Sequence, residues 1–164
     1  LELADALMTE CIEKFGNDGG GFFDTEGEVL GTRLRRVEDI PHPSANAIAV
    51  VLLLKLFHLT GKESYHSTAE KTLKIFCRVA GEMGIHAGTY FCALDAYFRM
   101  LKLTVEADPG SDLSRAALAL SGPYSTILYG VNNGRVIPCI NETCLEPITD
   151  PAQLKDFSRR LPAR

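Results

Sequence analysis

The sequence predicts a mainly α protein that ends in a small α/β element. Two observations support this prediction. Over residues 1–102, apolar residues recur every three to four positions in long segments, which is the period of amphipathic helices. From residue 103 onward the pattern changes to short strand-like runs separated by turn residues. We therefore expect a helical part at residues 1–102 and an α/β C-terminal element at residues 103–164.

The first expected helix covers residues 3–15, because its apolar residues follow the spacing of one helical face. It ends at the Gly- and Asn-rich run 16–21, since these residues accept the left-handed backbone of a helix C-terminus. A polar and charged loop then extends to Pro43. Within this loop, residues 22–37 carry only a weak hairpin signal.

The second expected helix covers residues 45–59, with Ser44 as its N-cap, and its apolar residues surround the axis. We expect other elements to bury it on all sides. The third helix, residues 63–83, is one-sided, and the fourth, residues 87–102, is mostly apolar. This alternation indicates an inner and an outer layer of helices. A plain bundle is one alternative, but the long loop favours helix hairpins stacked in a ring or solenoid.

The C-terminal element reads as a short α/β succession. Its expected parts are a strand at 103–107, a helix at 113–120, strands at 124–129 and 135–140, and a last helix at 152–161. Thr149 or Asp150 caps the last helix, with Pro151 in its first turn.

Composition excludes several classes of protein. The 164 residues include 17 basic and 21 acidic side chains, so the net charge of −4 speaks against a nucleic-acid partner. Apolar runs are far shorter than the roughly 20 residues that span a bilayer, so no membrane partner is expected. The first residues lack a signal peptide, which predicts a cytoplasmic protein. No cofactor is indicated.

The chain begins without an initiator Met and reads as a segment of something longer. Helices that would pack against missing parts expose apolar surface, so we expect the isolated chain to self-associate.

The loop before the second helix holds the densest set of candidate functional residues. Its acid/base candidates are Asp24, Asp39 and His42. Its candidate ligand-binding residues are the rings and polar groups of Phe22, Phe23, Arg35, Ser44 and Asn46. Aromatic rings beside carboxylates and amides are typical of a sugar-binding cleft, so a sugar ligand is predicted. The alternative is that the rings fill the base of the helical layer, the charges pair with one another and Ser44 is only a cap.

Cys139 and Cys144 form the second candidate site. Four residues separate them, unlike the C-x-x-C of thioredoxin active sites. A second ligand pair for zinc is missing, so no metal is expected. We expect free or reversibly oxidised thiols with a redox role, and a disulfide across a hairpin is the geometric alternative.

Two motif blocks at opposite ends of the chain resemble the spermatogenesis-associated protein 20 family, whose bacterial members include YyaL. The first block is Gly-Gly-Gly-Phe-Phe-Asp-Thr at 19–25, followed by Arg35 and by the run 39–46. The second is Cys139 with the run 143–151. Ala45 and Ala47 depart from the family pattern, which usually has Gly and Ser there, so ligand contacts made by those residues would be lost.

The resemblance implies an N-terminal thioredoxin-like domain followed by an (α/α) toroid of the six-hairpin-glycosidase type. This chain would hold the last part of that toroid and a C-terminal appendix. The expected fold class is therefore mainly α: helical hairpins of an incomplete (α/α) toroid, with a small α/β C-terminal element. The family's activity is not established.

Two functions follow as expectations. The first is a carbohydrate-binding or carbohydrate-modifying segment built on the loop. The second is a non-catalytic scaffold for the thioredoxin-like domain, with which Cys139 and Cys144 exchange electrons.

Overall fold

A computed structural model describes residues 1–29 and 31–160. The chain divides into two compact units, Leu1–Tyr97 and Phe98–Arg164. Within the described residues, no helix is both long enough and apolar enough to cross a membrane.

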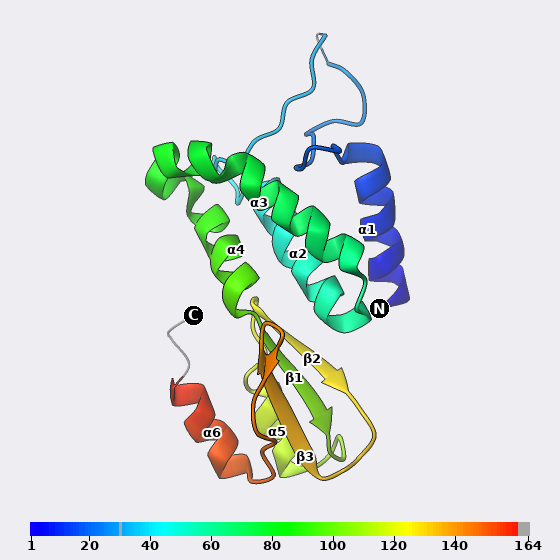
Figure 1. Cartoon of the computed structure of the whole chain (residues 1–164), viewed down its shortest axis with the longest axis vertical. Coiled ribbons are helices and arrows are strands. Elements are labelled where there is room, and N and C mark those ends of the chain that lie inside the picture. The colour runs from blue at the N-terminus through cyan, green and yellow to red at the C-terminus, as the bar shows by residue number, and fades with distance from the viewer. Residues whose placement is uncertain (30, 161–164) are drawn as a thin grey trace. The chain divides into compact units, whose positions relative to one another are not determined.

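The first unit consists of helices joined by loops (Figure 1). Its elements are α1 (Glu2–Phe15), α2 (Ala45–Thr60), α3 (Glu63–Met83), the 3₁₀ turn η1 (Gly84–Ala87) and α4 (Gly88–Arg99). Helices α2 and α3 pack side by side as a helix hairpin (Figure 1).

Helix α2 has the start and the end that its sequence predicts. The hydroxyl of Ser44 accepts a hydrogen bond from the Ala47 amide at 3.3 Å, and Gly61 ends the helix with a left-handed φ of 72°. Leu53 is fully buried. The expectation of burial on all sides is wrong, however, because Ile48 and Leu52 remain 42% and 46% exposed. Helix α2 therefore has an apolar outer face.

The second unit is built on a four-stranded mixed sheet in the order β2-β1-β3-β4. Strand β1 (Leu101–Glu106) pairs in parallel with β2 (Ser125–Tyr129), and α5 (Asp112–Leu118) connects the two strands. On the other side of β1, β3 (Arg135–Ile140) runs antiparallel, and β4 (Thr143–Cys144) forms a short hairpin with β3. Helix α6 (Pro151–Arg160) follows.

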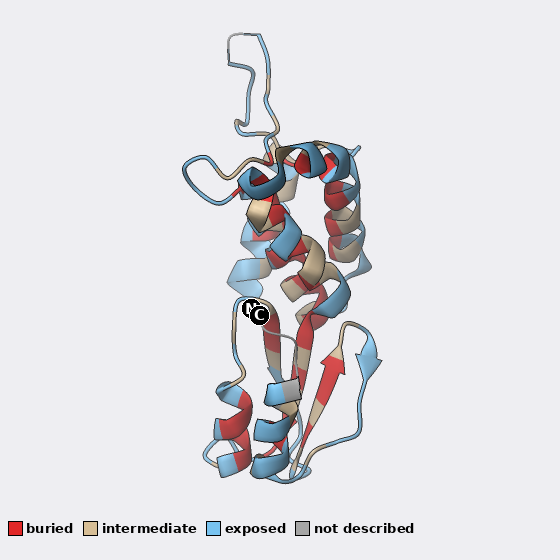
Figure 2. Ribbon diagram, turned by 90° about the vertical axis from the view of Figure 1, so that its left-hand side faces the viewer, coloured by how far each residue is buried: buried red, intermediate tan, exposed pale blue. Residues whose placement is uncertain are grey.

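One face of this sheet packs against α5 and α6. Leu101, Leu103 and Val105 of β1 form a core cluster with residues of both helices, including Leu113 and Leu154. Side chains alternate along a strand, so the intervening residues of β1 lie on the opposite face. In Figure 2 the strands are mostly red and tan, whereas the flanking helices show pale blue outer sides.

The mixed sheet corrects the predicted fold class. The chain is an α/β protein, not mainly the helical hairpins of an incomplete (α/α) toroid. The expected fourth helix also ends too late, because α4 stops at Arg99 and β1 begins at Leu101. Leu101 fits the helical period that starts at Leu94 as well as the alternation of β1, so the residue pattern alone misplaces this boundary.

Candidate functional site

Asn46, near the start of α2, binds the loop that precedes this helix, and it is only 2% exposed. The Asn46 side chain accepts a hydrogen bond from the Phe22 amide at 2.6 Å and donates one to the Phe22 carbonyl at 3.0 Å. It also donates to the carbonyl of Arg36 at 2.8 Å. Phe22 itself is 5% exposed and belongs to the core. The predicted ligand-binding residues Asn46 and Phe22 thus hold the loop in place.

The side chain of Asp39 also binds backbone groups. Its carboxylate accepts hydrogen bonds from the Ser44 amide at 2.8 Å and from the Thr89 amide at 2.7 Å. Burial favours the neutral acid, but these two amide donors outweigh it and lower the pKa of Asp39 below its ordinary value. The charged carboxylate therefore links the loop to the first turn of α4, whose amides lack partners within the helix.

Asp24 and the arginines of the loop contact charged, aromatic and backbone groups of the same loop. Asp24 forms an ion pair with Arg36 at 3.1 Å. The guanidinium of Arg33 lies 4.0 Å from the centre of the Phe23 ring, and that of Arg35 lies 5.4 Å from it. Arg35 also donates to the carbonyl of Gly20 at 2.8 Å. Of these contacts, only that between Asp24 and Arg36 is of the kind expected in the alternative in which the charges of the loop pair with one another.

A surface hollow of about 270 Å³ lies beside Asp24. Its lining residues are Asp24, Thr25, Val29, Thr32, Leu34 and Arg36. Asp39 and His42 are not among these lining residues, and His42 lies exposed in the loop. The structure therefore brings Asp24 together with Arg36, but it does not gather the three acid/base candidates around this hollow.

The two cysteines of the second candidate site form a disulfide. Cys139 on β3 lies directly opposite Cys144 on β4, with a Cα–Cα distance of 3.9 Å. The pair stands at the edge of the sheet, and its two members differ in exposure. Cys139 is 1% exposed, whereas Cys144 is exposed. One sulfur atom of the bond thus belongs to a residue that a partner can reach.

The sequence marks Arg36 as a residue of the polar loop without predicting its partner, and it gives Thr89 no role in the loop. Arg36 pairs with Asp24, and Thr89 supplies an amide to Asp39. The first-turn position of Thr89 is a usable signal, because the amides of a first helical turn need partners outside the helix. No local signal predicts the ion pair between Arg36 and Asp24, because the two residues meet only when the loop folds back on itself.

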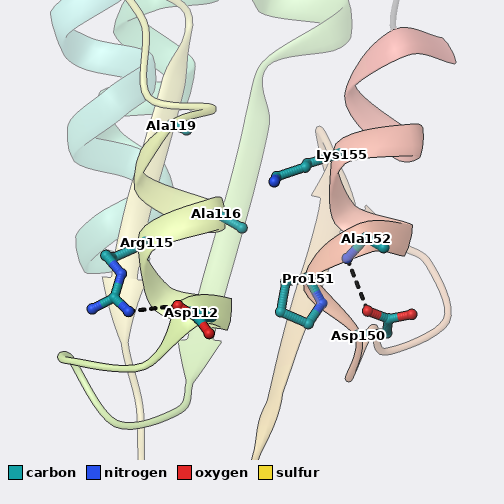
Figure 3. Close-up of a pocket in the computed structure, with 8 residues that line it drawn as sticks. All are labelled: Asp112, Arg115, Ala116, Ala119, Asp150, Pro151, Ala152 and Lys155. Atoms are coloured by element: carbon teal, nitrogen blue, oxygen red, sulfur yellow. Dashed lines mark hydrogen bonds and ion pairs between the residues drawn. The ribbon is translucent and has the colours of Figure 1, made fainter.

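Another hollow, of about 530 Å³, lies between α5 and α6 (Figure 3). None of the sequence-predicted site residues lines it. Its polar groups make contacts within or beside the two helices. On α5, Arg115 forms an ion pair with Asp112. At the start of α6, the Asp150 carboxylate accepts a hydrogen bond from the Ala152 amide at 2.9 Å. Within the described ranges, no group of three or more His, Cys, Asp or Glu side chains is arranged to hold a metal ion.

Fold and site together define an α/β chain with a hairpin disulfide and a loop stabilised by its own polar side chains. This chain is distantly related to the spermatogenesis-associated protein 20 family. It is 26% identical to spermatogenesis-associated protein 20 of Homo sapiens over 85% of its own length and 21% of the human protein. The protein of the same name from Rattus norvegicus is also 26% identical, over 84% of the chain. The chain spans about a fifth of the length of these relatives. No family model matches it.

Proposed function

We propose that the chain is a non-catalytic scaffold and interaction module whose Cys139–Cys144 disulfide exchanges with a protein dithiol. The observation that carries this proposal is the disulfide at the sheet edge, in which the exposed Cys144 is joined to the buried Cys139. Exchange requires access to one of the two sulfur atoms, and Cys144 is an exposed residue of β4.

The partner chemistry follows from the bond. A thiolate of the partner attacks one sulfur, a mixed disulfide forms, and the electron pair of the old bond leaves on the other sulfur. The second thiol of the partner then attacks the mixed disulfide, which leaves both cysteines of this chain reduced and the partner oxidised. As the dithiol partner we propose the thioredoxin-like domain that the family resemblance implies.

The loop supports the non-catalytic part of the proposal. Asp39 accepts two backbone hydrogen bonds, Asn46 binds backbone groups and Asp24 is paired with Arg36. A general acid or base needs a proton to exchange with a substrate, and these groups are already engaged with the protein.

The test is native reduction followed by mapping of the thiols. The folded chain is treated with dithiothreitol, quenched with acid, alkylated in denaturant and digested for mass spectrometry. Cys139 and Cys144 should be unlabelled before reduction and labelled after it. Cys11, Cys77 and Cys92 are free and serve as internal controls that label in both samples. Labelling of Cys139 and Cys144 before reduction, or their protection after it, would refute the proposal.

Sugar binding is a second candidate, favoured by the hollow beside Asp24. A hydroxyl-rich ligand there would donate to the Asp24 carboxylate, whose side chain is 35% exposed. The test is NMR titration with D-glucose of the unaltered chain and of Asp24→Asn. Binding that Asp24→Asn weakens would support this candidate. Equal titration curves, or no binding by either chain, would dismiss it.

A further inference from the structure

The register of the sheet places a lysine next to the disulfide. Lys102 of β1 lies directly opposite Cys139 of β3, and Cys139 in turn lies directly opposite Cys144 of β4. Side chains of directly paired residues stand on the same face of a sheet. Lys102, Cys139 and Cys144 therefore form a row across the face opposite to the one that packs against α5 and α6.

We propose that Lys102 promotes opening of this disulfide by stabilising Cys139 as the leaving thiolate. This inference rests on the proposed exchange function and specifies its direction. A partner thiolate attacks Sγ of the exposed Cys144 and forms a mixed disulfide with it. The bond between the two cysteines breaks, and its electron pair leaves on Sγ of Cys139, which then takes a proton from solvent. Attack in the other direction is blocked, because Cys139 is 1% exposed.

Because Cys139 is buried, its thiolate needs a stabilising group nearby. A thiolate that forms at a buried position is disfavoured by loss of hydration, and a nearby cation offsets that loss. Directly opposed residues in an antiparallel pair have Cβ atoms about 5 Å apart, so the flexible lysine stem brings its ammonium group within reach of Sγ. A thiol whose thiolate is stabilised is also the better leaving group in exchange.

The charge of Lys102 is free for this role. In the part of the chain that the structure describes, no carboxylate forms an ion pair with Lys102. The acidic residue on the same face of β1 is Glu106, which is bound by Arg135 at 2.6 Å and by Asn133 at 3.0 Å. The row of Lys102, Cys139 and Cys144 therefore includes one positively charged side chain, directly opposite Cys139 in the register of the sheet.

The first experiment locates the attack. The free cysteines of the oxidised chain are blocked with iodoacetamide, and the folded chain is then exposed to glutathione, quenched with acid and digested. We expect the glutathione adduct on Cys144. An adduct mainly on Cys139 would overturn the proposed direction.

The second experiment measures the rate of reduction by dithiothreitol in Lys102→Gln, Lys102→Arg and the unaltered chain. Loss of the charge should slow reduction about three- to tenfold, because a cation near a developing thiolate is worth on the order of a factor of five in partly screened surroundings. Lys102→Arg keeps the charge and should restore the rate. Arg159→Gln is the matched control, because it removes the same charge from α6, which packs on the other face of the sheet, and it should change the rate little.

The outcomes separate the two proposals. If Lys102→Gln is reduced as fast as the unaltered chain, or if Lys102→Arg is as slow as Lys102→Gln, the role of Lys102 is refuted while disulfide exchange stands. If dithiothreitol does not reduce the folded unaltered chain at all, disulfide exchange fails and this inference fails with it. Circular dichroism of each variant verifies that the sheet is intact.

Discussion

Asp39 lies where the loop meets α2, and two backbone amides converge on its carboxylate. Its own amide donates to the carbonyl of His86 at 2.7 Å, so both ends of the residue are committed to backbone partners. The charged carboxylate stabilises the fold, because it accepts hydrogen bonds from two backbone amides at the starts of α2 and α4. These amides have no acceptor within their own helices.

The lowered pKa of Asp39 predicts a specific pH dependence of stability. The folded-state pKa lies below that of the unfolded chain, so the stabilisation is present above the unfolded value and is lost as pH falls through the folded value. Asp39→Asn should therefore lower the free energy of unfolding at neutral pH and flatten its dependence below about pH 4. Urea unfolding of both chains between neutral and acidic pH measures this. Parallel curves for the two chains would contradict it.

At the scale of elements, the helix boundaries were largely predictable from the sequence. Ser44 and Gly61 mark the ends of α2 through side-chain capping and left-handed backbone, which are local effects. The junction between α4 and β1 was not predictable, because pairing with β2 and β3 decides it and those partners lie more than 20 residues away. Strand β4 was missed for a related reason: a two-residue strand has no periodicity to recognise.

The candidate site was predictable in its residues but less so in their roles. The sequence marks Asp24, Asp39 and Asn46 as an unusual group of polar side chains before an apolar helix. Whether such groups face a ligand or the backbone depends on how the loop folds, and no local pattern encodes that. The structure adds that Asn46 and Asp39 bind the backbone, while their predicted roles towards a ligand remain untested predictions.

The glycine turn after α1 gives a prediction at this scale. Gly20 has a φ of 101°, and a Cβ there would lie 2.5 Å from the carbonyl oxygen of Lys71 on α3. Gly20→Ala should therefore lower the free energy of unfolding by about 2–4 kcal/mol. Gly27→Ala is the matched control, because a Cβ at Gly27 meets nothing within 4 Å, and it should change stability by less than about 1 kcal/mol. Equal urea midpoints for the two variants would argue against the close packing of the turn on α3.

At the scale of the whole molecule, the chain exposes large apolar side chains on two helices of the first unit. Leu3 and Leu7 on α1 are 73% and 57% exposed, and Ile48 and Leu52 on α2 add to them. Such apolar surface is costly in water, so we propose that the isolated chain self-associates. Sedimentation velocity should show species heavier than 17.9 kDa whose fraction rises with concentration. A monodisperse monomer across the concentration range would refute this.

The hairpin disulfide closes a very small ring, since its cysteines are only five positions apart in the chain. A covalent link restrains an unfolded chain in proportion to the logarithm of the segment it encloses, so this one removes little freedom, on the order of 2 kcal/mol. Strand β3 of this hairpin is also held by its hydrogen bonds to β1, which do not involve sulfur. Reduction of the hairpin should therefore lower the free energy of unfolding of this unit by about 2 kcal/mol, while the hydrogen bonds between β1 and β3 stay in place.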